Sequence, residues 1–151
     1  MDCISINTLI IKQPETHDEL EAYYQLRWQL LAKPWGQPFD ISQDDKESQS
    51  YHLMAVYNQN IIGVCRLHFN TADEAQIRYM GIVDSYQRQG IATKLIKALE
   101  NYAKDQRAKT IVLNAREIAI PFYTSQGYSY VEDAHVVFNI IHHVKMKKDL
   151  S

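Results

Sequence analysis

The sequence predicts an α+β (mixed α/β) domain, in which a central mixed sheet of about seven strands is flanked by about four helices. Three strand-like segments follow one another with short polar links, which predicts antiparallel pairing. A long amphipathic helix then leads to a short apolar strand, expected to lie parallel to the strand before that helix. With 151 residues, 46% of them hydrophobic, the chain fits one domain over residues 1–151.

The first elements are a strand and a capped helix. Ile4–Lys12 mixes β-branched and polar residues and stops before Pro14, which predicts a strand and then a break. Thr16 and Glu19 form a capping-box pattern at the start of an amphipathic helix, and Pro34 ends it.

A polar segment, residues 35–50, follows that helix. We expect a mobile surface loop with a short helix. Its acidic residues are expected to be solvated, although such a loop can also cover an acceptor and attract a cationic amine. These residues are Asp40, Asp44, Asp45 and Glu47.

Three consecutive strands are expected next. His52–Tyr57 and Ile61–Phe69 are joined by residues 58–60, where asparagine tolerates the left-handed conformation of a tight hairpin. A polar turn over residues 70–74 leads to the third strand, which ends at Ile82 and Val83.

The second half of the chain alternates helices and strands. Residues 90–106 carry one apolar stripe at helical spacing, which predicts the longest helix. A second, short helix has Pro121 in its first turn and Gly127 past its end. The remaining expected elements are a strand at Thr110–Ala115, the short helix at Ile118–Gln126, and closing strands at Tyr128–Glu132 and Ile141–Lys147.

Composition limits the classes of partner. A formal net charge of −2 gives no general attraction to nucleic acid, and no apolar run is long enough for a membrane span. Cys3 and Cys65 lie in apolar runs, and without a signal peptide we expect free thiols and a cytoplasmic protein. His142 and His143 are adjacent in a strand and point to opposite faces, so we expect no metal site.

The most informative stretch is residues 77–96, which is typical of a strand, a turn and the start of a helix. Gly90 and Ala92 are small, so a phosphate can approach the backbone closely. The first turn of a helix offers unpaired N–H groups and the positive end of its dipole. The stretch therefore predicts an anion-binding turn.

Two sequence motifs, one in this turn and one later in the chain, resemble those of a known family. Residues 87–92, Gln-Arg-Gln-Gly-Ile-Ala, resemble the Gln/Arg-x-x-Gly-x-Gly/Ala motif of the GNAT superfamily of acyl-CoA-dependent N-acyltransferases. About thirty residues later, residues 122–128 resemble its Phe-Tyr-x-x-x-Gly-Phe/Tyr motif. Leu26-Arg27, Arg66-Leu67 and residues 114–116 are similar to the ElaA-like branch.

The resemblance implies a GNAT-type fold with acetyl-CoA as co-substrate and no metal. It implies that main-chain N–H groups of the turn hold the pyrophosphate and that a bulged strand edge at residues 80–83 pairs with the pantetheine arm. Tyr123 matches the position of the acid that protonates the departing thiolate. The residues implied to bind coenzyme A are Ile82, Val83, Gln87, Arg88, Gln89, Gly90, Ile91, Ala92, Thr93, Asn114 and Phe122.

The sequence defines the residues that would bind the amine acceptor less well than those for coenzyme A. Arg66, Arg78 and His143 are candidate substrate residues, and the two arginines would favour an acceptor with a carboxylate or phosphate, or else serve as surface charge. Many relatives have a carboxylate on the strand before the turn, where this chain has Gln76 and Arg78. The general base stays open among Glu74, Asp84, Glu117, His143 and an ordered water.

Two functions fit these observations. The first is an enzyme, an N-acetyltransferase (an acyltransferase that transfers groups other than aminoacyl groups), which moves acetyl to a small-molecule or peptide primary amine by direct transfer through a ternary complex. The alternative is a non-catalytic acyl-CoA-binding sensor or interaction module. Neither requires nucleic acid or a membrane, and both allow a monomer or a homodimer.

Overall fold

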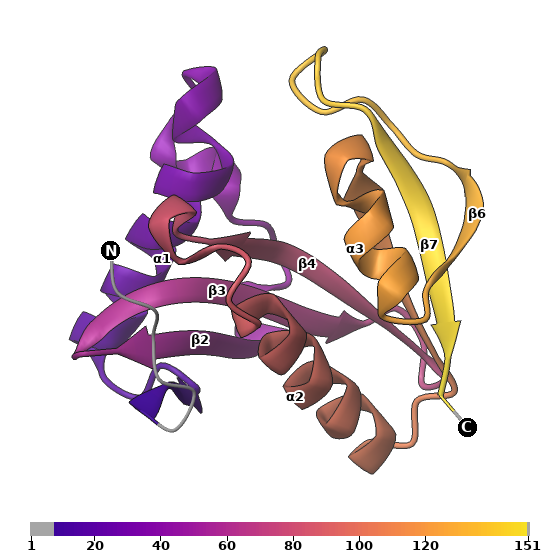
Figure 1. The fold of residues 1–151 in the computed structure, drawn as a ribbon, viewed down its shortest axis with the longest axis horizontal. Helices are drawn as coiled ribbons and strands as arrows, with labels where there is room; N and C mark the ends of the chain where they lie inside the picture. The colour runs from indigo at the N-terminus through magenta and orange to yellow at the C-terminus, as the bar shows by residue number, and fades with distance from the viewer. Residues whose placement is uncertain (1–7, 151) are drawn as a thin grey trace. The chain divides into compact units, whose positions relative to one another are not determined.

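The computed structural model (Figure 1) describes residues 8–150, which divide into two compact units. Unit 1 contains residues 8–68 together with Tyr79–Leu99. Unit 2 contains Phe69–Arg78 and residues 100–150. One strand and one helix, β4 (Glu74–Ile82) and α2 (Ile91–Asp105), continue from one unit into the other.

Seven strands form one mixed sheet in the order β1-β2-β3-β4-β5-β7-β6. The pairs β1–β2 and β2–β3 are antiparallel, β4–β5 is parallel, and β7 pairs antiparallel with both β5 and β6. The predicted mixed sheet and the predicted parallel pair are thus confirmed. The strands are β1 (Ile10–Lys12), β2 (Tyr51–Tyr57), β3 (Asn60–Phe69), β4 (Glu74–Ile82), β5 (Thr110–Arg116), β6 (Ser129–Asp133) and β7 (His143–Asp149).

Residues 8–150 also form three α-helices and several 3-10 helices. The predicted capping box at Thr16 and Glu19 is confirmed, with Glu19 N–H donating to the Thr16 hydroxyl at 3.0 Å. The predicted strand at Ile4–Lys12 lies partly outside the described residues, as does Cys3. The helices are α1 (His17–Leu31), α2 (Ile91–Asp105) and α3 (Ile120–Ser125), with 3-10 helices at Lys33–Trp35, Phe39–Ser42, Glu47–Gln49, Asp84–Tyr86 and Glu117–Ala119.

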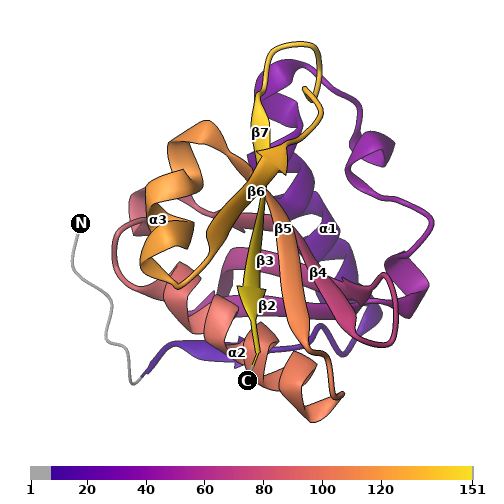
Figure 2. The ribbon, with the colours of Figure 1, turned by 90° about the vertical axis from the view of Figure 1, so that its right-hand side faces the viewer.

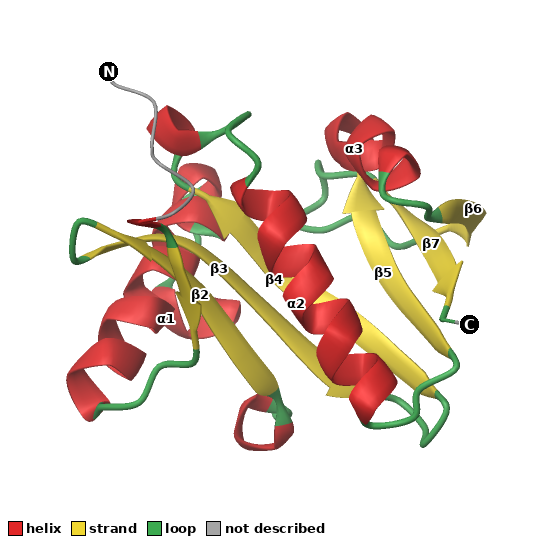
Figure 3. Ribbon diagram, turned by 60° about the horizontal axis from the view of Figure 1, so that its bottom comes forward, coloured by secondary structure: helices red, strands yellow, loops and turns green. Residues whose placement is uncertain are grey.

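In unit 1, α1 lies on one face of β2 and β3, and the first turns of α2 lie on the other (Figures 1 and 3). Tyr23, Met54 and Val64 form the buried centre on the α1 side. A Cβ at Gly81 would lie 3.2 Å from a methyl carbon of Leu30, so glycine lets α1 pack closely against the end of β4.

The β2–β3 hairpin turns as predicted. Asn58 and Gln59 have φ of 50° and 66°, the left-handed conformation that a two-residue turn of type I′ requires. The free thiol of Cys65 on β3 is fully buried.

In unit 2, β5, β7 and β6 lie side by side, with β6 at the edge (Figure 2). Glu100, near the end of α2, is 5% exposed and binds two groups. Its carboxylate accepts the Tyr128 hydroxyl at 2.9 Å and the Lys148 ammonium at 3.0 Å. Lys148 also donates to the carbonyl of Gln126 at the end of α3, so this network ties α3 to β7 and α2.

The segment between α1 and β2 corrects the prediction of solvated acidic residues for two of the four, since Asp40 and Asp45 are exposed but Asp44 and Glu47 are not. It forms three 3-10 helices, and the side chains of Asp44 and Glu47 are only 20% and 12% exposed. Both carboxylates are bound by buried arginines, because a buried guanidinium requires a paired anion.

Candidate functional site

The predicted anion-binding turn lies in unit 1 between β4 and α2. Arg88 and Gly90 both have left-handed backbones, with φ of 64° and 84°. Turns that contain left-handed residues can bring successive N–H groups together in a concavity that suits anions. α2 begins immediately afterwards at Ile91 and runs for 15 residues.

The position of Gly90 shows that the turn is open. A Cβ built on Gly90 would meet no other atom within 4 Å. Gly90 is exposed, whereas the side chain of Ile91 is buried and anchors the helix start to unit 1. The geometry therefore fits a phosphate group held by backbone N–H donors.

Gln87, the first residue of the motif, fixes the turn to the strand end. Its side-chain amide donates to the Ile82 carbonyl at 3.3 Å and to the Asp84 carboxylate at 3.2 Å. Gln87 thereby braces the chain as it leaves β4. Asp84, one of the open base candidates, is engaged by this bond.

The hydrogen bonds of Val83 indicate which way the backbone N–H groups point at the end of β4. The N–H of Val83 donates to the Ile62 carbonyl at 2.9 Å, and the Val83 carbonyl accepts from Tyr86 at 2.8 Å. The N–H of Val83 is thus used inside unit 1, so its predicted contact with coenzyme A would come from the second lone pair of its carbonyl or from its side chain. Successive N–H groups of a strand point to opposite edges, which directs the Ile82 N–H away from β3.

β4 has one unusual backbone conformation near its end. Tyr79 has φ of 58°, a left-handed conformation that is rare for an aromatic residue. The Tyr79 ring stands against two guanidiniums, with 4.2 Å from its centroid to Arg27 Cζ and 5.0 Å to Arg66 Cζ. Cation–π contacts of this kind hold the ring in place.

Arg66 is engaged differently from the substrate role predicted for it. It is fully buried, and its two terminal nitrogens bind Asp44 at 2.6 Å and 3.1 Å. Glu47 Oε2 lies 2.7 Å from Arg66 Nη1 and 2.9 Å from Arg27 Nη1. The four residues form a buried ionic cluster, and this engagement does not favour a direct contact between Arg66 and an acceptor.

His52 borders the ionic cluster. Its Nε2 lies 2.7 Å from the Glu47 carbonyl and its Nδ1 2.9 Å from the Tyr23 hydroxyl. Burial is the main cause that lowers the His52 pKa from its ordinary value. A neutral imidazole then donates from Nε2, because a carbonyl oxygen only accepts.

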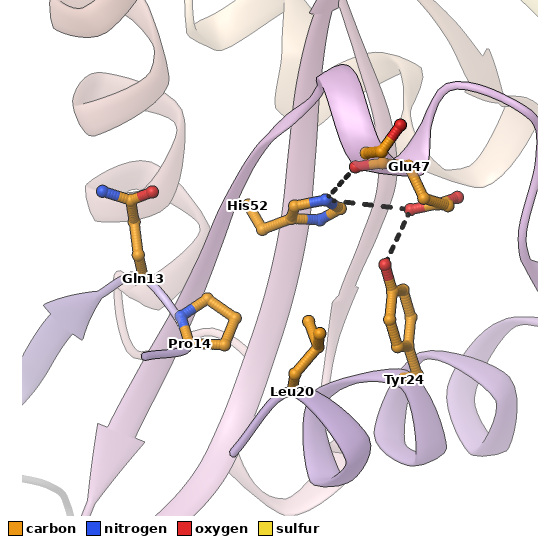
Figure 4. Close-up of a pocket in the computed structure, with 7 residues that line it drawn as sticks. Gln13, Pro14, Leu20, Tyr24, Glu47 and His52 are labelled. Carbon is orange, nitrogen blue, oxygen red and sulfur yellow. Dashed lines mark hydrogen bonds and ion pairs between the residues drawn. The ribbon is translucent and has the colours of Figure 1, made fainter. Parts of the chain in front are cut away.

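A hollow of about 420 Å³ opens beside His52 and Glu47 (Figure 4). None of the predicted site residues lines it, so it lies apart from the expected acetyl-transfer chemistry. Its lining residues are Gln13, Pro14, Leu20, Tyr24, Glu47, Ser48 and His52.

The second motif lies in unit 2, on α3. Tyr123 is 7% exposed, and its ring stands edge-on to those of Phe122 and Tyr128 at 5.1 Å and 5.9 Å. The Tyr123 carbonyl accepts the N–H groups of Gln126 and Tyr128, which closes the end of α3. Asn114 is exposed on β5.

His143 begins β7 in unit 2, where Arg116 of β5 is its register partner. Its Nδ1 lies 3.0 Å from the Ile141 carbonyl, so Nδ1 carries the proton and Nε2 is left as an acceptor. Burial and the positive charges of His135, Arg116 and Arg78 lower the His143 pKa. The ring of His135 stacks on His143 at 6.2 Å.

The two remaining carboxylates among the base candidates lie in different surroundings. Glu74 accepts the Asn70 amide at 2.9 Å, and the exposed Glu117 begins a 3-10 helix.

Within residues 8–150, no three histidine, cysteine or acidic side chains gather into a metal-binding group. In the same part of the chain, none of the helices has the length and apolarity needed to cross a bilayer.

Sequence reasoning missed the roles of Arg27, Glu47 and Tyr79. Arg27 lies on the apolar stripe of α1, and a charge on such a stripe is a signal for a buried ion pair when acidic residues follow in the chain. The left-handed backbone of Tyr79 has no comparable signal, because tyrosine is an ordinary strand residue.

The sheet order and the open turn before α2 agree with the GNAT-type fold that the sequence motifs predict. A model of the acetyltransferase (GNAT) domain matches residues 34–150, which include parts of both units. The chain therefore belongs to the GNAT acetyltransferase family.

Individual sequences and solved structures of this family are similar to the chain. The chain is 24% identical over 135 residues to the uncharacterized N-acetyltransferase YjcF of Bacillus subtilis, covering 89% of this chain and 96% of YjcF. Escherichia coli ElaA has the same fold, with a TM-score of 0.76 and 19% identity over 93% of this chain and 97% of ElaA. A GNAT acetyltransferase of Elizabethkingia anophelis, crystallised with acetyl-CoA, gives a TM-score of 0.77 and 17% identity over 95% and 99% of the two chains.

Glu47→Gln tests the buried ionic cluster. Removing the charge leaves Arg27 and Arg66 with one carboxylate, so we expect a loss of about 3 kcal/mol in the free energy of unfolding, measured by urea denaturation. Glu21→Gln is the control, because Glu21 is 64% exposed and its change should cost no more than about 0.5 kcal/mol. Equal losses in the two variants would contradict the cluster's role.

Gly90→Ala tests the turn, with Gly36→Ala as a matched control. Both glycines have positive φ and open space around a new Cβ, so both variants pay a similar conformational cost of about 1 kcal/mol. Only Gly90→Ala places a methyl group where a phosphate would approach. We expect calorimetry to show acetyl-CoA binding weakened by about tenfold or more in Gly90→Ala alone; similar affinities in both variants would exclude the turn.

Proposed function

We propose that the chain is an acetyl-CoA-dependent N-acetyltransferase that moves acetyl to a primary amine by direct transfer within a ternary complex. The observation that carries the proposal is the open turn at Arg88 and Gly90 directly before α2, in a chain of the GNAT family. The presence of acetyl-CoA in the Elizabethkingia anophelis relative supports this donor.

The backbone of the turn would hold the donor. N–H groups from Arg88 to Thr93 would bind the pyrophosphate, with the Thr93 hydroxyl as a further donor. The strand edge at residues 80–83 would pair with the amides of the pantetheine arm. The family resemblance also assigns contacts with the donor to Asn114 and Phe122.

The transfer needs two groups besides a base. A neutral amine attacks the thioester carbonyl, and the tetrahedral oxyanion then expels the thiolate. The Ile82 N–H, which points away from β3, would stabilise the oxyanion. Tyr123 would protonate the thiolate, because a phenol with a pKa near 10 keeps its proton at neutral pH until the thiolate forms.

His143 is the base that the local geometry favours. Its Nδ1 is bound to the Ile141 carbonyl, so Nε2 is available to accept a proton from the amine. The lowered pKa keeps the ring neutral at pH 7, the form that a base requires.

An amine panel with detection of released thiol tests the proposal on the wild type, Tyr123→Phe and Tyr130→Phe. We expect turnover with at least one primary amine, and a loss of about 10² to 10⁴ in kcat for Tyr123→Phe with unchanged acetyl-CoA affinity. Tyr130 is 60% exposed on β6, so its variant should keep full activity. Acetyl-CoA binding without any turnover would favour the sensor instead, and unchanged turnover in Tyr123→Phe would remove Tyr123 from the mechanism.

The pH profile tests His143. The neutral ring is the active form, so kcat/KM, calculated on the concentration of neutral amine, should be full above the ordinary histidine pKa of 6.5 and fall only below the lowered pKa of His143. His143→Gln should lose this acid limb together with most of the rate, whereas His17→Gln, exposed on α1, should keep both. An acid limb that persists in His143→Gln would show that another group is the base.

A further inference from the structure

Three short contacts link His52 and Tyr23 to two backbone carbonyls in unit 1. His52 Nε2 lies 2.7 Å from the Glu47 carbonyl, and His52 Nδ1 lies 2.9 Å from the Tyr23 hydroxyl. The same hydroxyl lies 2.8 Å from the Cys65 carbonyl of β3. Each distance is that of a hydrogen bond, and each hydrogen bond needs one proton between its two atoms.

When His52 is neutral, its ring and Tyr23 have too few protons for these contacts. A neutral imidazole carries one N–H proton and a phenol carries one O–H proton, so two protons serve three contacts. Whichever ring nitrogen carries the proton, one contact is left with two facing lone pairs. Arg27 Nη2 also donates to the Tyr23 oxygen at 3.1 Å, but that proton lies between Arg27 and Tyr23 and serves none of the three.

A protonated imidazole satisfies all three contacts. Its Nε2–H donates to the Glu47 carbonyl and its Nδ1–H donates to the Tyr23 oxygen, while the Tyr23 hydroxyl donates to the Cys65 carbonyl. The two lone pairs of the Tyr23 oxygen then accept from His52 and Arg27. Hydrogen bonds from a cationic donor are the stronger kind, so the folded chain can accommodate this charge.

The groups around His52 set the pH at which it takes up the proton. Glu47 Oε1, 4.0 Å from Nε2, favours the cation. Burial is the main cause that lowers the His52 pKa, and the charges of Arg27 and Arg66 lower it further, so the ring is neutral at pH 7. The titratable and charged groups around the ring are Tyr23, Tyr24 and Arg27 of α1, Glu47 of the 3-10 helix before β2, and Cys65 and Arg66 of β3.

We propose that His52 and Tyr23 form a proton-operated switch in unit 1. When His52 Nδ1 takes up one proton from water, the Tyr23 hydroxyl turns from Nδ1 to the Cys65 carbonyl, and the heavy atoms keep their partners. The hollow gives the proton its route, because His52 lines it and its side chain is 13% exposed (Figure 4). The new charge lies beside Glu47, which binds Arg27 and Arg66, so the ionic cluster responds to pH.

NMR of the full chain between about pH 8 and pH 5 tests the switch. The ring nitrogens of His52 report its protonation, and the carbonyl carbon of Cys65 reports the bond from Tyr23. We expect Nδ1 to change from acceptor to donor with a midpoint below the ordinary histidine pKa of 6.5, and the Cys65 carbonyl to shift with the same midpoint. A Cys65 carbonyl that ignores this titration, or a His52 that keeps one protonation state while the chain is folded, would overturn the proposal.

Tyr23→Phe tests the role of the hydroxyl, with Tyr24→Phe as its matched control. Without the hydroxyl, the Nδ1–H of the cation has no acceptor, so the His52 pKa should fall by about one further pH unit and the Cys65 carbonyl should lose its pH response. The Tyr24 hydroxyl donates to Glu47 at 3.5 Å instead of to His52, so Tyr24→Phe should keep that response. The same behaviour in both variants would contradict the switch.

The pH dependence of stability gives a second readout. The folded pKa of His52 is lowered, so the unfolded chain binds the proton first as the pH falls. The His52 contribution to the free energy of unfolding should be full above pH 6.5, decrease down to the lowered pKa, and level off below it. Urea denaturation should show this step lost in His52→Gln and kept in His17→Gln, whose side chain is 88% exposed. A step that persists in His52→Gln would assign it to another group.

Discussion

The burial of Arg27 and Arg66 is the constraint on which unit 1 depends. Two guanidiniums with no exposed surface need anions, and Asp44 and Glu47 supply them from the segment between α1 and β2. These bonds fix that segment to α1 and β3. They also place both guanidiniums against Tyr79, so the left-handed residue of β4 is held by the same ion pairs.

The fixed position of Tyr79 matters because the role proposed for unit 1 rests on its backbone N–H groups. Beyond Tyr79, Val83 bonds to β3 and Gln87 braces the Ile82 carbonyl, so the strand end and the turn form one fixed set of donors. A fixed donor aimed at a developing charge contributes more than a mobile one, because no reorganisation is needed during reaction. From unit 2 the proposed mechanism takes two side chains instead, Tyr123 of α3 and His143 of β7.

The sequence predicts the elements well because their signals are local. The capping box at Thr16, the hairpin at Asn58 and the stripe of α2 each depend on neighbouring residues. The environment of Glu47 could not be predicted in the same way, since its partners come from α1 and β3, and an acidic residue between elements is usually solvated. The bonding of Gln87 and the tautomer of His143 likewise follow from where carbonyls lie in space.

In the proposed function, the backbone from Ile82 to Thr93 binds the acyl donor. A titration of the ¹⁵N-labelled chain with acetyl-CoA, followed by amide NMR, tests this role. We expect the largest shifts at the amides of Ile82 and of Arg88 to Thr93, with little change around His52. Shifts centred on the hollow beside His52 and Glu47, with the turn amides unaffected, would contradict it.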